Sequence, residues 1–175
     1  MVYEERFGFD SKTALVLLIS VAFVAGAILL PDMSPVLRIL TLALFGGGGL
    51  LLLVTSLSRK VALRVDQAGI TLGGAPPRHR SMTQHIPWAD VEAVVLWRQR
   101  SASNLPWIGV LRRADAPPLA GGRRVMTTAA AALGGAPDER LMQCARAING
   151  WKLDVAGMAA AVQVLAPHVR VDDHR

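Results

Sequence analysis

Two long uncharged apolar runs constrain the first third of this chain. They cover residues 13–30 and residues 39–58, and neither contains a charged side chain. Because an α-helix rises by about 1.5 Å per residue, each run is close to the length needed to cross a hydrocarbon core of about 30 Å. The short connection contains Pro31 and Pro35, which are expected to stop helix continuation. The pattern therefore predicts a transmembrane hairpin of two antiparallel helices over residues 13–58.

A cleaved signal peptide is the alternative interpretation of the first run. The small residues Ala25, Gly26 and Ala27 resemble a cleavage site. However, the segment before the run carries acidic as well as basic residues, and a second apolar run follows at once. A signal peptide instead begins with a positively charged segment. These features favour a hairpin that is retained.

A run of four glycines lies inside the second apolar run. Small side chains let membrane helices approach closely, above all at a spacing of four residues. Two interpretations remain open. The small residues form the contact between the two helices of the hairpin, or they form a surface for a second copy or another membrane protein. The small residues expected to pack in this way are Ala22, Gly26, Ala43, Gly46, Gly47, Gly48 and Gly49.

The positive charge of the chain lies outside the apolar runs. The formal net charge is +6, and residues 59–175 hold 16 Lys and Arg against 9 Asp and Glu, a balance of +7. Arg59 and Lys60 directly follow the second run, whereas the connection between the runs offers only Arg38. By the positive-inside tendency, both termini are expected in the cytoplasm and the protein in the cell membrane. A basic domain beside a bilayer is expected to contact anionic headgroups.

After residue 60 the apolar pattern changes to the alternation of short strands. Strands are predicted over residues 61–66, 70–72, 83–86, 91–100, 107–113 and 123–128. Residues 141–151 fit either a helix or a strand. Gly69 is expected to need a positive φ in the first turn, and Asp154 is expected to cap a helix that ends before Pro167.

Several strands followed by one helix predict a mainly β domain of the α+β class, built as a small barrel or sandwich with a C-terminal helix. The fold class is therefore a membrane α-hairpin plus a β domain. The chain divides into a cytoplasmic N-terminal segment (1–12), the hairpin (13–58) and the β domain (59–175).

Three short segments of the β domain resemble the bacterial pleckstrin-homology-like (PH-like) domains. They are Val65-Asp66-Gln67-Ala68-Gly69-Ile70, Ile86-Pro87-Trp88-Ala89-Asp90-Val91, and Trp151-Lys152-Leu153-Asp154 leading into Ala166-Pro167-His168-Val169. The resemblance covers about residues 59–172. It implies a PH-like fold preceded by transmembrane helices, an arrangement that many bacterial proteins of this type share. The turn at residues 67–69 is too short for the basic phosphate-clamping motif of the phosphoinositide-binding members, so inositol-lipid specificity is not implied.

Basic residues are the candidate contacts to lipid or to a protein partner. They are Arg59, Lys60, Arg64, Arg78, Arg80, Arg98 and Arg100. The four histidines lack metal-ligand spacing, and Cys144, the single cysteine, is expected to be a buried apolar residue. The sequence contains neither a phosphate-binding glycine loop nor a nucleophile elbow, and aromatic residues make up only 5% of it. We therefore expect no metal, no cofactor, no enzymatic activity and no nucleic-acid binding.

The function expected from these features is that of an interaction module at the cytoplasmic face of the cell membrane. Its expected partners are membrane lipids, a protein of unknown identity or a second copy of the chain. The alternative is an accessory or assembly subunit of a larger membrane complex, which would dock through its glycine-rich helix.

Overall fold

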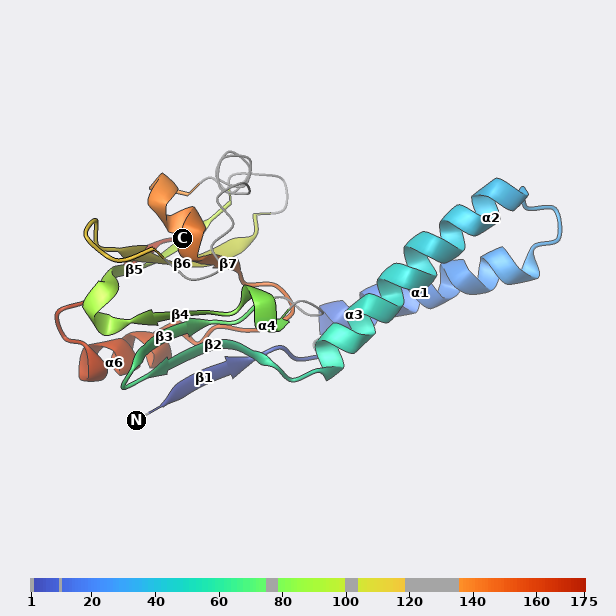
Figure 1. The fold of residues 1–175 in the computed structure, drawn as a ribbon. Helices are drawn as coiled ribbons and strands as arrows, with labels where there is room; N and C mark the ends of the chain where they lie inside the picture. The colour runs from blue at the N-terminus through green and yellow to red at the C-terminus, as the bar shows by residue number, and fades with distance from the viewer. Residues whose placement is uncertain (1, 10, 75–78, 100–103, 119–135) are drawn as a thin grey trace.

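The computed structural model describes residues 2–9, 11–74, 79–99, 104–118 and 136–175. A helical hairpin extends from one end of a β domain (Figure 1). The predicted combination of apolar helices with a β domain is confirmed at this level.

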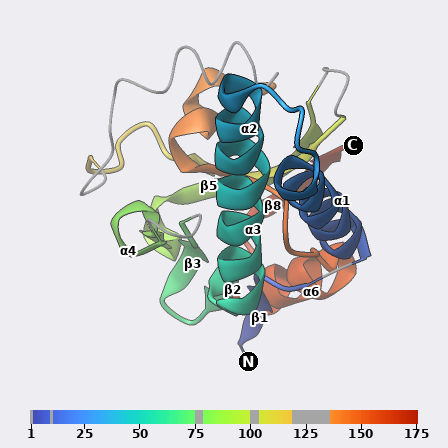
Figure 2. The ribbon, with the colours of Figure 1, turned by 90° about the vertical axis from the view of Figure 1, so that its right-hand side faces the viewer.

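The hairpin consists of two helices. The first is α1 (Ser11–Leu29), and the second runs through α2 (Pro35–Thr41), the π-helical segment η1 (Leu42–Gly47) and α3 (Gly48–Leu57). Both are long and apolar enough to cross a membrane. Figure 2, seen from the hairpin side, shows them next to each other in front of the β domain.

The connection at the tip of the hairpin is shorter than predicted. Pro35 does not stop the second helix but begins it, at a position where proline's missing N–H has no helical partner to lose. Arg38 lies within α2, and its guanidinium donates a hydrogen bond to the carbonyl oxygen of Leu30 at 2.8 Å. The side chain thereby caps the end of α1, whose last carbonyl groups have no partner within the helix.

Small residues at intervals of about seven form the seam between the two helices. They are Thr13, Ser20 and Ala27 on α1, and Thr41, Gly49 and Ser56 on the second helix. The step from Thr41 to Gly49 is eight residues and crosses η1, whose wider turn accommodates one extra residue. Both halves of the second helix therefore present small residues to α1. The hydroxyl groups of Ser20 and Ser56 donate to carbonyl oxygens four residues earlier, at 2.9 and 2.8 Å.

The first sheet has four antiparallel strands in the order β1-β2-β3-β4. They are β1 (Tyr3–Arg6), β2 (Val61–Asp66), β3 (Gly69–Leu72) and β4 (Gln84–Pro87). The single helical turn α4 (His79–Met82) precedes β4, and the 3-10 turn η2 (Trp88–Asp90) follows it. Gly69 has a φ of +152°, and a Cβ atom there would lie 2.1 Å from the carbonyl oxygen of Ile86. The predicted β2–β3 hairpin and its glycine are confirmed.

The second sheet has the order β7-β6-β5-β8. Its strands are β5 (Val91–Arg98), β6 (Pro106–Arg112), β7 (Ala145–Ala147) and β8 (Arg170–His174), and β8 pairs with β5 in parallel. The ambiguous segment 141–151 contains both kinds of structure, because the 3-10 helix η4 (Glu139–Cys144) leads directly into β7. The strand predicted over residues 123–128 lies outside the described residues.

The helical hairpin is inserted between two neighbouring strands of the first sheet. β1 precedes the hairpin and β2 follows it, and the two strands pair from Tyr3 opposite Val65 to Arg6 opposite Val61. The pairing continues toward the hairpin, where the backbone N–H of Phe7 donates to the carbonyl oxygen of Lys60 at 2.9 Å. Residues 3–6 thus belong to the sheet of the β domain and not to a separate N-terminal segment.

The main core lies between the sheets and α6 (Val155–Leu165), which packs against β1 and β2. Met158 and Val162 of α6 are fully buried there. Asp154 caps the helix as expected, because its carboxylate accepts the Gly157 N–H at 3.1 Å. Burial of the apolar faces of both sheets and one helix stabilises this arrangement.

Candidate membrane-surface site

Four segments meet at the hairpin-proximal end of the β domain. They are the end of β1, the connection 58–60, the turn α4 and residues 148–152. Ring nitrogen Nε2 of His79 lies 2.8 Å from the carbonyl oxygen of Val61, which fixes α4 beside the start of β2. The N–H of Gly8 donates to the carbonyl oxygen of Gly150 at 3.0 Å. These bonds hold the four segments together at the base of the hairpin.

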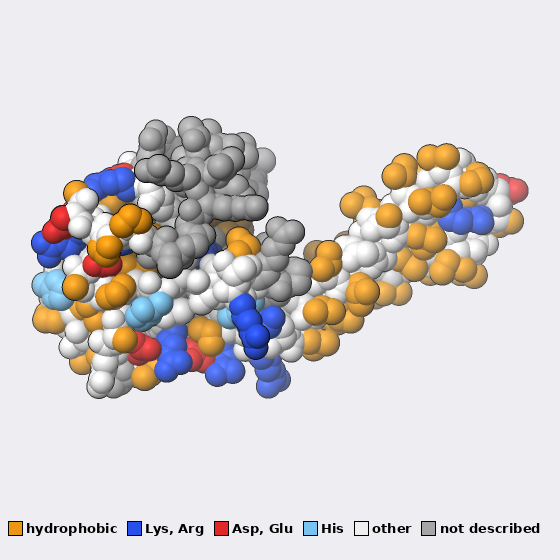
Figure 3. Space-filling model, in the orientation of Figure 1, with side chains coloured by type: hydrophobic (Ala, Val, Ile, Leu, Met, Phe, Trp, Pro, Cys, Tyr) orange, Lys and Arg blue, Asp and Glu red, His pale blue; other side chains and the backbone are white. Residues whose placement is uncertain are grey.

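Positive side chains gather at this end, as Figure 3 shows where the hairpin leaves the domain. Arg59 and Lys60 directly follow α3, and Lys12 lies in the first turn of α1. Arg80 is exposed on α4. Arg98 ends β5 opposite Pro106, whose carbonyl oxygen accepts the N–H of Ile148 at 2.8 Å.

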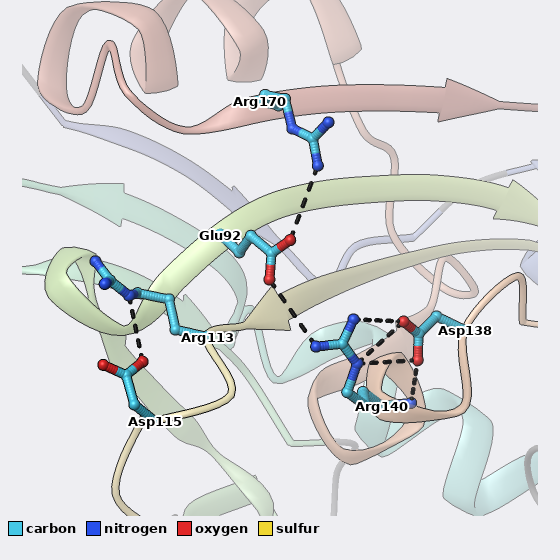
Figure 4. A network of polar contacts seen from close by, with 6 residues as sticks. All are labelled: Glu92, Arg113, Asp115, Asp138, Arg140 and Arg170. Atoms are coloured by element: carbon cyan, nitrogen blue, oxygen red, sulfur yellow. Dashed lines mark hydrogen bonds and ion pairs between the residues drawn. The ribbon is translucent and has the colours of Figure 1, made fainter.

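Most other exposed arginines that the structure describes in the β domain are paired with a carboxylate. Glu92 lies between Arg140 and Arg170, at 4.0 and 3.9 Å, and Arg113 pairs with Asp115 at 3.4 Å (Figure 4). The guanidinium of Arg140 also lies 2.8 Å from Asp138 and lowers the pKa of that carboxyl group. Such exposed pairs contribute little to stability, but they neutralise the charge of the surface that carries them.

The hairpin-proximal cations differ in this respect. Among the residues that the structure describes, none of the following has a carboxylate within ion-pair distance: Lys12, Arg59, Lys60, Arg80, Arg98 and Lys152. Among the described residues, these cations thus have no ion-pair partner, whereas the arginines of the paired surface have one. An uncompensated basic surface attracts anions within about a Debye length of it.

The structure distributes the sequence candidates unevenly. Arg59, Lys60, Arg80 and Arg98 lie at the hairpin-proximal end. Arg64 lies within β2 and pairs with Asp66 at 3.1 Å and more loosely with Glu4 at 3.9 Å. Arg78 and Arg100 lie outside the described residues.

Sequence reasoning missed Lys12 and Lys152 as members of this site. Lys12 falls within the segment 1–12 of the sequence-based division. Lys152 reaches the hairpin base through the contact of residues 150–152 with the end of β1. That contact joins segments far apart in the chain, and no local sequence pattern indicates it.

Two buried polar residues belong to the fold and not to this site. Cys144 is fully buried in the core, as expected, and burial raises the pKa of its thiol to about 11. The guanidinium of Arg146 donates to the carbonyl oxygens of Gly73, at 3.1 Å, and of Met82, and so ties β7 to the first sheet. Burial lowers the pKa of Arg146. Within the described part of the chain, no cluster of three His, Cys, Asp or Glu residues could hold a metal.

The small residues of the hairpin fall into two groups. A Cβ atom on Gly49 would lie 3.1 Å from Cβ of Ser20, and one on Gly46 would lie 3.7 Å from Val24. These two glycines face α1. In contrast, Gly26, Gly47 and Gly48 face outward. Apart from the neighbouring backbone of its own helix, a Cβ atom on any of these glycines would have no atom within 4 Å. Ala22 and Ala43 are exposed as well.

Comparison of the chain with protein-family models, curated proteins and solved structures found no match.

Proposed function

We propose that this protein is a membrane-anchored interaction module whose hairpin-proximal end binds the anionic surface of the cytoplasmic leaflet. The observation that carries the proposal is the distribution of ion pairs. Exposed arginines elsewhere on the β domain have carboxylate partners, whereas the cations nearest the hairpin have none among the described residues. Anionic headgroups would supply the missing counter-charge. The proposal assigns no catalytic step to the chain.

The orientation in the cell membrane follows from the same charges. Arg59, Lys60 and Lys12 flank the domain-side ends of the two helices, while Arg38 lies near the tip. The positive-inside tendency then favours a cytoplasmic β domain. Because β1 and β2 pair, the N-terminal segment lies on the same side. Two small sheets packed with α6 support a PH-like architecture, although β8 follows this helix and pairs in parallel with β5, which the sequence did not predict.

A lipid surface suits this site better than a protein partner does. The cations lie at the base of the hairpin, where headgroups are the nearest anions. Each Lys or Arg near an anionic surface contributes about 1 kcal/mol, and the effect fades within a Debye length. The chain joins the domain to the hairpin twice, from β1 into α1 and from α3 into β2. These two connections keep the cations close to the proposed headgroups.

The test measures which lipids surround the site in the full-length protein. A fluorophore attached through Met82→Cys would report on α4, because Met82 is 41% exposed and Cys144 is buried. The protein is reconstituted with lipids that carry a headgroup quencher on either phosphatidylglycerol or phosphatidylcholine. We expect several-fold stronger quenching by the anionic lipid at low salt, falling toward equality at high salt.

Charge variants supply the matched control. Replacing Arg59, Lys60 and Arg80 together with Gln is expected to abolish the preference. The control replaces Arg113, Arg140 and Arg170 with Gln, which removes the same charge from the ion-paired surface, and is expected to keep it. Equal quenching by both lipids at low salt would contradict the proposal and leave a protein partner as the better interpretation.

A second candidate function is docking of the hairpin to another membrane protein, as an accessory subunit. The specific observation in its favour is that Gly47 and Gly48 face open space and not α1, so helix packing within the hairpin does not explain them. Replacing both with Leu should then change the set of membrane proteins that co-purify with the chain. An unchanged set would argue against this function.

A further inference from the structure

A pocket of about 220 Å³ opens beside the base of the hairpin. Its lining includes Glu5 and Arg6 from β1, Gly8 and Phe9 from the link to α1, and Trp151 and Lys152 before α6. It exists because the link to α1 runs beside residues 150–152, where Gly8 and Gly150 share a backbone hydrogen bond of 3.0 Å. The pocket therefore lies where the chain passes from the β domain into the apolar hairpin.

The polar side of the pocket offers two cations. Nε of Arg6 donates to Glu4 at 2.6 Å, which orients the guanidinium, and a guanidinium has four further N–H donors. Lys152 is exposed and has no carboxylate partner among the described residues. Glu5 also lines the pocket, and it accepts a hydrogen bond from the Tyr3 hydroxyl at 2.9 Å. The lining side chains Arg6, Lys152 and Glu5 carry a net charge of +1, and Glu4, which is paired with Arg6, brings the local balance to zero. Lys152 is therefore the lining cation that has no carboxylate partner among the described residues.

The apolar side of the pocket is aromatic. Phe9 is 54% exposed although it lies only two residues before α1. Trp151 is almost fully buried, and its indole N–H donates to the carbonyl oxygen of Ala147 at 3.1 Å. An exposed phenylalanine next to a membrane helix gains by burial among lipid. Cations and an aromatic wall side by side match a ligand that carries phosphate next to an apolar part.

We infer that this pocket binds the phosphate group of a single phospholipid, with Arg6 and Lys152 on the phosphate and Phe9 against the glycerol and upper acyl chain. The inference rests on the proposed function, since it adds one defined lipid position to a broadly attractive surface. The recognised chemistry is an oxygen-rich phosphate anion, which guanidinium and ammonium groups bind by charge-assisted hydrogen bonds. A lipid headgroup and soluble inorganic phosphate share that chemistry.

The experiment uses the full-length protein reconstituted with dioleoyl-phosphatidylglycerol, released into mild detergent and weighed by native mass spectrometry. We expect one phosphatidylglycerol molecule to remain bound to the wild type. The variant Arg6→Gln/Lys152→Gln should lower the retained fraction about tenfold, because it removes two charge-assisted contacts. The matched control, Arg113→Gln/Arg170→Gln, removes the same charge from the ion-paired surface and should retain the lipid. Thermal unfolding of each variant checks that it is folded.

Competition separates the two sources of phosphate. Excess inorganic phosphate should not displace the bound lipid, whereas short-chain phosphatidylglycerol should. Displacement by inorganic phosphate alone, or equal lipid retention in both double variants, would overturn the inference. In the second case, a persisting preference for anionic lipid in the quenching measurement would leave the proposed function standing.

Discussion

Arg59 occupies a backbone conformation in which glycine is usual. It follows Ser58, the C-cap of α3, with a φ of +46°. Glycine favours this place at the end of a helix because it has no Cβ atom to clash in the left-handed region. Arg59 therefore has a strained backbone, and its side chain places a cation at the base of the hairpin.

We expect Arg59→Gly to raise the free energy of unfolding of the β domain by about 1 kcal/mol while lowering the preference for anionic lipid. Denaturant unfolding, monitored by tryptophan fluorescence, tests the change in stability. The quenching measurement tests the change in lipid preference. Lys60→Gly is the control, because Lys60 has no positive φ among those observed and glycine there should not stabilise. A destabilised Arg59→Gly protein would contradict this account.

Cys144 makes the free energy of unfolding depend on pH in the alkaline range. Burial raises the pKa of its thiol from 9.0 to about 11, so between these values the unfolded chain loses a proton that the folded chain keeps. Stability therefore falls as pH rises through this window, by at most about 3 kcal/mol. Unfolding midpoints compared at pH 8 and pH 10.5 should drop further in the wild type than in Cys144→Ala. Parallel pH dependences of the two proteins would refute the prediction.

At the scale of elements, the π-helical segment η1 lets both halves of the second helix of the hairpin pack against α1. A regular helix would turn the residues after η1 away from α1, because the seam spacing is eight residues there instead of seven. The wider turn restores the alignment, so that Gly49 meets Ser20. A π-bulge of this kind is a specific feature of the packing and not a general loosening caused by glycine.

Leucine substitutions distinguish the two faces of the glycine run. Gly49→Leu should separate the helices, since even a Cβ atom there lies 3.1 Å from Ser20, and overpacking typically costs about 1–3 kcal/mol. Gly47→Leu should be tolerated because its Cβ position is open. Thermal unfolding in detergent, read as the fall in the yield of a disulfide that an added oxidant forms between cysteines placed along the seam, measures the difference. Similar stabilities for both variants would speak against the observed seam.

Local pattern predicted the elements that carry their own signal. The apolar runs gave both helices within a few residues, and alternation gave β2, β3, β5 and β6. Neither pattern predicted β1 or β8. Tyr3–Arg6 and Arg170–His174 are short and rich in charge, and each becomes a strand only because a partner from a distant part of the chain pairs with it. The candidate site shows the same division, because Arg59 and Lys60 follow from topology whereas Lys152 depends on long-range contact.

At the scale of the whole molecule, the β domain is joined to the hairpin twice. A single tether would let the domain swing, but here the chain enters α1 from β1 and leaves α3 into β2. The two strands are hydrogen-bonded to each other up to Phe7 and Lys60. The hairpin-proximal end is thereby held at the base of the hairpin.

This arrangement predicts the labelling pattern of three single-cysteine proteins. Val2→Cys and Arg175→Cys should react with a membrane-impermeant maleimide from the same side, and Asp32→Cys at the tip from the opposite side, because paired β1 and β2 cannot lie across a bilayer from each other. Each variant is made with Cys144→Ala, and labelling of intact and inverted vesicles reads the sides. Opposite sides for positions 2 and 175 would exclude the hairpin topology.

Insertion of the hairpin between β1 and β2 also bears on biosynthesis. The ribosome completes β1 before either helix, and β2 only after both, so the sheet cannot close until the hairpin has been made. A chain in which only one helix crossed the bilayer would strand β1 on the far side and leave the edge of β2 unpaired, a hallmark of aggregation-prone intermediates. For the proposed membrane hairpin, completion of the first sheet would therefore accompany integration of both helices.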